Sequence, residues 1–198
     1  MDELQLLEVM QMKTLTDSNQ NKHLFSVPIT QDVTREQREE LKGEKKIALR
    51  CPQVLNNAVL AVIENPVFYD NRKEEISTRF FGTFSHKHPK IERILVQGDF
   101  LVSGSRMRFV RNVEFGDQLD QYRITPAQVY AEVQKRNADA VYAFQLRNPL
   151  HNGHVLLLKD TRQQLLKQGY KNPILLLHPL GGWVKDDDVP LDTRMRQH

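Results

Sequence analysis

Apolar residues in the first half of the chain recur in short runs separated by turn residues, a pattern typical of strands. The runs predict strands at residues 24–29, 47–51, 58–63, 91–96, 100–102 and 107–110. Helical spacing of Leu4, Leu7 and Met10 predicts a helix over residues 2–12, followed by a polar loop over residues 13–22. Further helices are expected at residues 34–43, where Thr34–Gln37 has the form of a capping box, and at 66–80. Residues 1–115 are therefore expected to form a strand-rich domain of barrel or sandwich type.

The pattern changes at Gly116, after which helices and strands alternate. A capping box at Thr125–Gln128 predicts a helix to about Asn137, and a strand (140–145), a helix (153–168) and another strand (174–177) follow. This is a βαβ unit, in which ligands bind at the carboxyl ends of the parallel strands. Residues 189–198 predict one more helix. A two-stranded unit cannot bury both its faces, so we expect residues 116–198 to be the truncated first part of an α/β domain.

Composition narrows the class of protein. The chain has 198 residues, 39% of them hydrophobic, which is enough for one or two packed domains. Its net charge of +3 is spread along the sequence, so a nucleic-acid partner is not expected. The single cysteine, Cys51, excludes an internal disulfide and indicates a reducing compartment, with the cytoplasm as the default. No run is long enough to span a membrane, and the acidic start Met1–Glu3 is unlike a signal or transit peptide.

The richest stretch chemically is Gln145–His154, which lies between a predicted strand and a predicted helix. The first N–H groups of a helix are unpaired there and favour anions, phosphates above all. His151 and His154 are three residues apart, so their imidazoles lie on one face and could donate to one phosphoryl group. Arg147 offers a planar fork of donors for a tetrahedral oxyanion, and Gln145 and Asn148 add neutral donors.

Two other interpretations of this stretch compete with an anion site. The histidines could merely cap the helix, or they could be part of a metal site whose further ligands are distant in sequence. Elsewhere, Asp186–Asp188 could be magnesium ligands, but three consecutive aspartates point in different directions and are more often a solvated loop; Lys185 has the same interpretation.

The stretch Gln145–His154 resembles the signature of ATP sulfurylases, within the wider His-x-Gly-His nucleotidyltransferase superfamily. Further segments are similar to that family at residues 79–83, 88–89, 98–102, 117–126, 137–141, 175–182 and 188–192. The variant with Trp183 and Asp186–Asp188 is most like the sulfurylase part of animal bifunctional phosphoadenosine-phosphosulfate synthases. Ser103–Ser105 departs from the family's turn at that point.

The resemblance implies a PUA-like domain (1–115, incomplete at its start) followed by the start of a Rossmann-like nucleotidyltransferase domain (116–198, truncated). It also implies transfer of the adenylyl group of ATP to sulfate, with Mg²⁺ on the nucleotide. Gln145 and Arg147 would hold sulfate, and Asn148 and the backbone near Leu146 would contact ATP phosphates. His151 and His154 would stabilise the transition state.

On the same basis we expect the parent protein to be a homodimer. Fusion of the parent to an adenylyl-sulfate kinase domain is compatible with the resemblance. The family's later segment that closes over ATP is not in these 198 residues, so the chain by itself is expected to be a fragment with little or no turnover. Three alternatives stay open: another nucleotidyltransferase of the same superfamily, a degenerate non-catalytic paralogue, and a PUA-like RNA-binding module.

Overall fold

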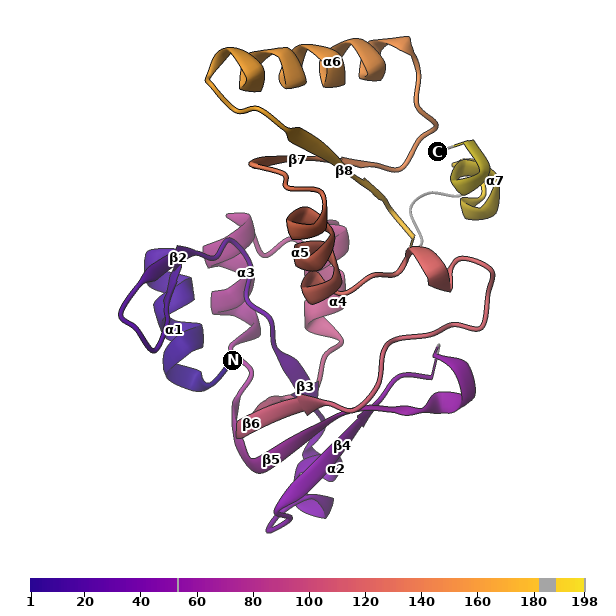
Figure 1. Cartoon of the computed structure of the whole chain (residues 1–198). Helices are drawn as coiled ribbons and strands as arrows, with labels where there is room; N and C mark the ends of the chain where they lie inside the picture. Colours follow the sequence, from indigo (N-terminus) through magenta and orange to yellow (C-terminus); the bar gives the residue numbers. More distant parts are fainter. Residues whose placement is uncertain (53, 182–187, 198) are drawn as a thin grey trace. The chain divides into compact units, whose positions relative to one another are not determined.

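The computed structural model describes residues 1–52, 54–181 and 188–197. The chain divides into two compact units, Met1–Phe115 and Gly116–His198 (Figure 1). In the described part of the chain no helix is long and apolar enough to cross a membrane.

The first unit is built on a four-stranded antiparallel sheet. Its strands lie in the order β3 (Gln31–Val33), β6 (Phe100–Phe109), β5 (Val59–Asp70) and β4 (Lys46–Arg50). A buried apolar cluster joins all four strands through Val33, Ile47, Ile63 and Val102. Leu41, just after the short helix α2 (Arg35–Glu40), packs against this cluster. In the described sheet β3 and β4 are the two edge strands and do not pair with each other, so an open sheet with flanking helices is found in place of the expected barrel or sandwich.

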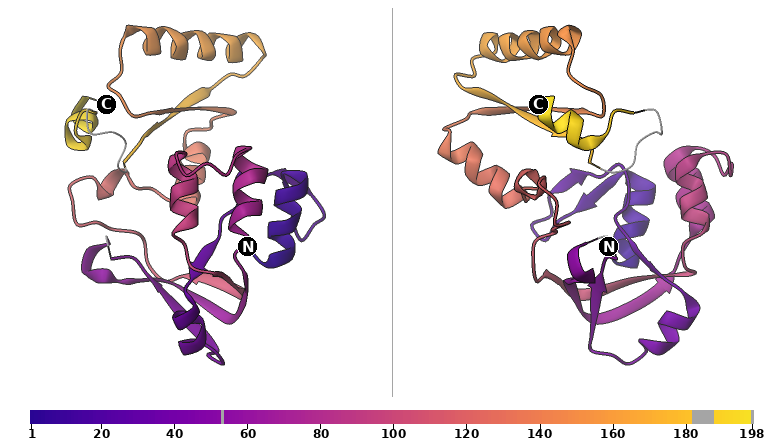
Figure 2. Two further views of the ribbon diagram at one scale, coloured as in Figure 1. Left: turned by 180° about the vertical axis from the view of Figure 1, so that it is seen from behind. Right: turned by 90° about the vertical axis from the view of Figure 1, so that its right-hand side faces the viewer.

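Three helices form a second apolar cluster with β5 and β6. They are α1 (Glu3–Met12), α3 (Lys73–Phe81) and α4 (Pro89–Leu95), and Figure 2 shows α1 and α3 side by side. The buried members of the cluster are Leu6, Met10, Tyr69, Ile76, Ile94 and Leu101. The predicted first helix is thereby confirmed, with Asp2 as its N-cap.

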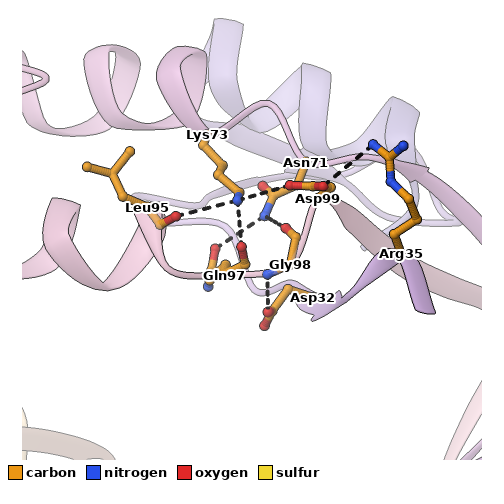
Figure 3. Close-up of polar contacts among 8 residues, drawn as sticks. All are labelled: Asp32, Arg35, Asn71, Lys73, Leu95, Gln97, Gly98 and Asp99. Atoms are coloured by element: carbon orange, nitrogen blue, oxygen red, sulfur yellow. Dashed lines mark hydrogen bonds and ion pairs between the residues drawn. The ribbon is translucent and has the colours of Figure 1, made fainter. Parts of the chain in front are cut away.

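A polar network near Gly98 ties the same elements together (Figure 3). The ammonium group of Lys73 donates to the carbonyl of Gln97 at 2.5 Å. The amide of Asn71 donates to the carbonyl of Gly98 at 2.9 Å, and the N–H of Gly98 donates to the carboxylate of Asp32 at 2.7 Å. This network fixes the end of α4 against the start of α3 and the end of β3.

Two predicted elements of the first unit are assigned wrongly. Residues 91–96 lie in helix α4 and its end, not in a strand, because His88 caps the helix and Pro89 occupies its first turn. The expected helix at 66–80 begins only at Lys73, since β5 runs on through Pro66 to Asp70. The ladder passes Pro66 in register with Gly104.

Smaller errors concern the hairpin and β6. The expected loop at residues 13–22 contains the strand β1 (Thr14–Thr16), which pairs with β2 (Lys22–Leu24). The expected strand at 24–29 is displaced, because β2 ends at Leu24. The two runs at 100–102 and 107–110 are parts of the single long strand β6. The expected pair at 47–51 and 58–63 is confirmed as β4 and β5, and the capping box at Thr34 is present.

The second unit contains the predicted βαβ arrangement. After the short 3-10 helix η2 (Asp120–Tyr122) come α5 (Pro126–Lys135), β7 (Ala140–Leu146), α6 (Asn152–Lys167), β8 (Pro173–Pro179) and α7 (Leu191–Gln197). Strands β7 and β8 are parallel, with Ala140 opposite Pro173 and Leu146 opposite Pro179. Figure 1 shows α6 running beside this pair. The elements predicted after residue 124 are all confirmed, with shifts of one or two residues at most of their ends.

Candidate active site

The stretch Gln145–His154 forms the turn between the end of β7 and the start of α6. Leu146 is the last residue of β7 and is buried, with 7% of its surface exposed. Helix α6 begins at Asn152, and His151 is its N-cap in extended conformation. The polar side chains therefore lie at the carboxyl end of a parallel strand and at the amino end of a helix, as the sequence predicted.

The two histidines cap the helix through their Nδ1 atoms. Nδ1 of His151 accepts a hydrogen bond from the N–H of Gly153 at 3.1 Å, and Nδ1 of His154 accepts one from the N–H of His151 at 3.4 Å. A neutral imidazole that accepts at Nδ1 carries its proton on Nε2. Both rings are thus held in the tautomer whose Nε2–H can donate to a ligand, since no protein hydrogen bond in the described chain engages Nε2.

Ring packing fixes the orientation of these imidazoles. The rings of His151 and His154 are stacked with centroids 3.7 Å apart at an angle of 24°, and Phe144 meets His154 edge-on at 5.3 Å. Gly153 leaves the necessary space, because a Cβ there would lie 3.0 Å from Cε1 and 3.1 Å from Nδ1 of His151. A larger residue at position 153 would therefore displace the His151 ring by a few tenths of an ångström.

The side chains of Gln145 and Arg147 are held from β8 and from the segment after it. The side-chain amide of Gln145 lies 3.1 Å from Nδ1 of His178, the residue opposite it in β8. With the amide nitrogen as the donor, Nδ1 of His178 accepts and the ring proton lies on Nε2. The guanidinium of Arg147 pairs with Asp188 at 3.4 Å, with 37% of the Arg147 side chain exposed and 9% of the Asp188 side chain.

Asn148 is exposed, and neither its side chain nor its N–H makes a hydrogen bond within the described residues. The six residues proposed from the sequence thus belong to one continuous turn: Gln145, Leu146, Arg147, Asn148, His151 and His154. The structure adds contacts of this turn with His178 and Asp188, which the sequence did not single out as partners of the site.

Arg194 of α7 is a further residue that sequence reasoning missed. Its side chain is buried, with 3% exposure, and its guanidinium donates to the carbonyl of Arg147 at 2.7 Å and to that of Leu180 at 3.0 Å. The only signal in the sequence is its position three residues after Leu191, which places both on one face of a short helix. An arginine at such a position is usually assigned to a solvated face.

At the opposite, amino-terminal end of the strands the polar contacts serve the fold. The carboxylate of Asp139 accepts from the N–H of Lys171 at 2.5 Å and from that of Asn172 at 2.8 Å. These backbone donors, that of Lys171 first, hold the pKa of Asp139 below its usual value. The contacts join the loops that precede β7 and β8, and so support the parallel pairing.

The donor set of the turn fits an anion and not a hard cation. Its side chains offer amide, guanidinium and imidazole groups, whereas Mg²⁺ prefers carboxylate, carbonyl and water oxygens. Within the described residues no group of three or more His, Cys, Asp or Glu side chains could hold a metal ion. Asp186, Asp187, Lys185 and Trp183 lie outside the described residues, and Asp188, the last of the three aspartates, pairs with Arg147.

Comparisons with known proteins agree with the sequence resemblance. A family model described as ATP-sulfurylase matches residues 120–198, and one described as PUA-like domain matches residues 1–110. Over 175 residues, 88% of this chain, ATP sulfurylase 2 of Arabidopsis thaliana is 44% identical and the chloroplastic ATP sulfurylase 4 of the same plant is 42% identical. A sulfate adenylyltransferase of Symbiobacterium thermophilum is 35% identical over the same length.

The chain spans 36% of the length of the two plant relatives and 41% of the bacterial one. Among solved structures, a hexameric APS kinase from Thiobacillus denitrificans matches with a TM-score of 0.60 and 17% identity. That match covers 100% of this chain and 32% of the other. At this identity the likeness concerns the fold alone.

Proposed function

Because the chain belongs to the ATP sulfurylase family and carries a PUA-like domain ahead of its strand-to-helix motif, we propose that the protein is a sulfate adenylyltransferase. The reaction converts ATP and sulfate into adenosine 5′-phosphosulfate and pyrophosphate. The observation that carries this proposal is the pair of stacked imidazoles whose Nε2–H groups are left for a ligand, one turn after Arg147.

The transfer is an in-line displacement at the α-phosphate. An oxygen of sulfate forms a new bond to the α-phosphorus, the bond from that phosphorus to the bridging oxygen of the β-phosphate breaks, and the electron pair leaves with pyrophosphate. Charge builds on the α-phosphoryl oxygens as the pentavalent centre forms. Donors that are already in place for that charge lower the barrier without reorganising.

Each residue of the turn has a part in this scheme. Gln145 and Arg147 bind sulfate, and their anchors on His178 and Asp188 limit the positions they can take. Asn148 and the backbone near Leu146 contact the ATP phosphates. His151 and His154 donate their Nε2–H groups to the α-phosphoryl oxygens. Mg²⁺ enters bound to ATP, as part of the substrate, and neutralises charge on its phosphates.

The test is sulfate-dependent release of pyrophosphate from MgATP by the protein expressed from its full reading frame. We expect release with sulfate and none with phosphate, which has the same shape but a different charge. Release that requires another acceptor would assign the protein to a different nucleotidyltransferase activity. Binding of RNA with no response to ATP or to adenosine phosphosulfate would instead favour a PUA-like binding module.

Compartment and assembly extend the same proposal. The single cysteine suits a reducing compartment such as the cytoplasm, although one plant relative is named chloroplastic. We propose a homodimeric parent, with room for a fused adenylyl-sulfate kinase domain. Sedimentation of the full-length protein and an assay for phosphorylation of adenosine phosphosulfate test these two points separately.

A further inference from the structure

Arg194 is a buried cation in the second unit, and it makes no ion pair in the described part of the chain. Burying a charge is costly unless hydrogen bonds replace its water. The Arg194 guanidinium replaces that water with three backbone carbonyls, those of Val189 at 2.8 Å, Arg147 at 2.7 Å and Leu180 at 3.0 Å. The contact with Val189 is local to the start of α7, whereas the other two reach the ends of β7 and β8.

The two distant carbonyls belong to the first residues after the parallel strands. Arg147 follows β7 and Leu180 follows β8. A backbone bond from the N–H of Leu180 to the carbonyl of Leu146, at 2.8 Å, joins the same two chain segments. The carbonyls of Leu146 and Arg147 are therefore both fixed by the end of β8 and by α7, immediately before Asn148.

The direction of a carbonyl determines the direction of the next N–H. The structure contains no cis peptide bond, and in a trans peptide the N–H points opposite to the carbonyl. Fixing the carbonyl of Arg147 thus fixes the N–H of Asn148, and fixing that of Leu146 fixes the N–H of Arg147. Neither N–H donates a hydrogen bond to any described residue. The N–H of Asn148 thus points away from Arg194, and the N–H of Arg147 points away from the N–H of Leu180.

We propose that Arg194 is a positioning residue of the anion site, which acts by holding the carbonyls of Arg147 and Leu180 and so aims the backbone donors of Arg147 and Asn148. This inference rests on the proposed function and deepens it. The positive charge of Arg194, which pairs with no carboxylate among the described residues, adds to the effect, because it favours negative ligands at the ends of these strands.

Lysine cannot replace arginine in this role. Nη1 of Arg194 donates to the carbonyls of Arg147 and Leu180, and Nε donates to that of Val189, so the planar group holds Nη1 in a fixed direction. An ammonium group has one nitrogen and no Nε donor, so lysine loses the bond to Val189 and this fixed direction. The same helix supplies a matched control, since Arg196 is exposed (75% of its side chain) and pairs with Asp192 on the surface. Arg194→Lys and Arg196→Lys therefore make the same chemical change in two different environments.

The experiment measures steady-state kinetics of the full-length protein with sulfate and MgATP. We expect Arg194→Lys to raise the KM for MgATP, whose phosphates these backbone donors contact in the proposed scheme, by about fivefold or more, and Arg196→Lys to stay within about twofold of wild type. Partial unfolding lowers the concentration of active enzyme, which reduces the apparent kcat but leaves KM unchanged. A purely structural role of Arg194 therefore predicts no change in KM.

A KM for MgATP within about twofold of wild type for Arg194→Lys would overturn the proposal. If that variant is insoluble, Arg194→Gln, which keeps donors without the charge, takes its place. Insolubility of both variants assigns Arg194 to folding alone and also overturns it. Wild-type protein without sulfate-dependent turnover would instead refute the proposed function, and the role of Arg194 with it.

Discussion

Replacing His151 by asparagine separates the capping role of this imidazole from its proposed catalytic role. The Oδ1 atom of asparagine occupies nearly the position of Nδ1, so it can accept from the N–H of Gly153 as the imidazole does at 3.1 Å. Asparagine is also among the best N-cap residues. What the substitution removes is the Nε2–H donor and the stacked ring on His154. Helix capping is thus retained while the proposed catalytic donor is lost.

The two interpretations of the motif predict different outcomes for His151→Asn. If the histidine only caps α6, the free energy of unfolding changes by no more than about 0.5 kcal/mol and turnover is unaffected. If its Nε2–H stabilises the transition state, loss of one preorganised donor lowers kcat by about 10²- to 10³-fold, which corresponds to roughly 2.7–4 kcal/mol. The two predictions differ by far more than the error of either measurement.

The assay pairs sulfate-dependent pyrophosphate release with thermal unfolding of the same preparations. Asn152→Ala is the matched control, because Asn152 lies in the same helical turn, is exposed and makes no hydrogen bond through its side chain within the described residues. We expect this control to keep wild-type turnover. Retention of more than about a third of wild-type kcat by a stably folded His151→Asn protein would refute the catalytic role of His151.

Three further predictions address the supports of the site. Gly153→Ala should leave the melting temperature unchanged or raise it, because alanine favours helix by roughly 1 kcal/mol. The same substitution should lower kcat about tenfold, because the new Cβ would lie 3.0 Å from the His151 ring. A wild-type kcat would show that the position of the ring is not critical. His178→Ala should raise the KM for sulfate a few-fold by releasing the Gln145 amide, and His178→Asn, which keeps an acceptor at the Nδ1 position, should restore it. Backbone donors hold the pKa of Asp139 below 3.8, so the stabilisation from this carboxylate is complete above about pH 4 and is lost as the pH falls through the folded-state pKa. Asp139→Asn should therefore lower the melting temperature at pH 7 and make it fall less on acidification than in the wild type. Parallel pH profiles of the two proteins would contradict this.

Local signals in the sequence predicted the second unit well. Capping boxes, glycine after the last helical turn and short apolar runs are each determined by residues within one or two turns of one another. They located α5, β7, α6 and β8, and the alternation of these elements implied the parallel pairing. The position of the motif at a strand end followed directly, because it depends only on the order of the elements.

The first unit was harder because short apolar runs do not distinguish strand from helix. Ile91 and Ile94 are buried on one face of α4, yet the run around them also suits a strand. The decisive signal was Pro89 at the first helical position with His88 before it as the cap. Conversely, the helix expected from residue 66 onward begins only at Lys73, because β5 continues to Asp70 through an irregular point at Asn65, which has a positive φ of 50°.

Contacts between distant segments could not be predicted at all. The pairing of Gln145 with His178 depends on the exact register of two parallel strands, and burial of Arg194 depends on where α7 packs. Sequence spacing says nothing about the register, and for Arg194 it gives only the helix face shared with Leu191. The residues that touch substrate in our proposal were thus found from the motif, whereas those that orient them required the structure.

The same chain also shows how it caps helices where no ligand is involved. Helices α2 and α5 begin with Thr34 and Thr125, whose hydroxyls accept backbone N–H groups while a glutamine three residues later completes the box. Helix α6 uses the same geometry with His151 and His154 in place of threonine and glutamine. A hydroxyl caps as well as an imidazole and needs no glycine beside it. What the imidazoles add is a second nitrogen whose proton no described residue accepts, so histidine in place of threonine and glutamine at this one helix supports the proposed anion site over capping alone.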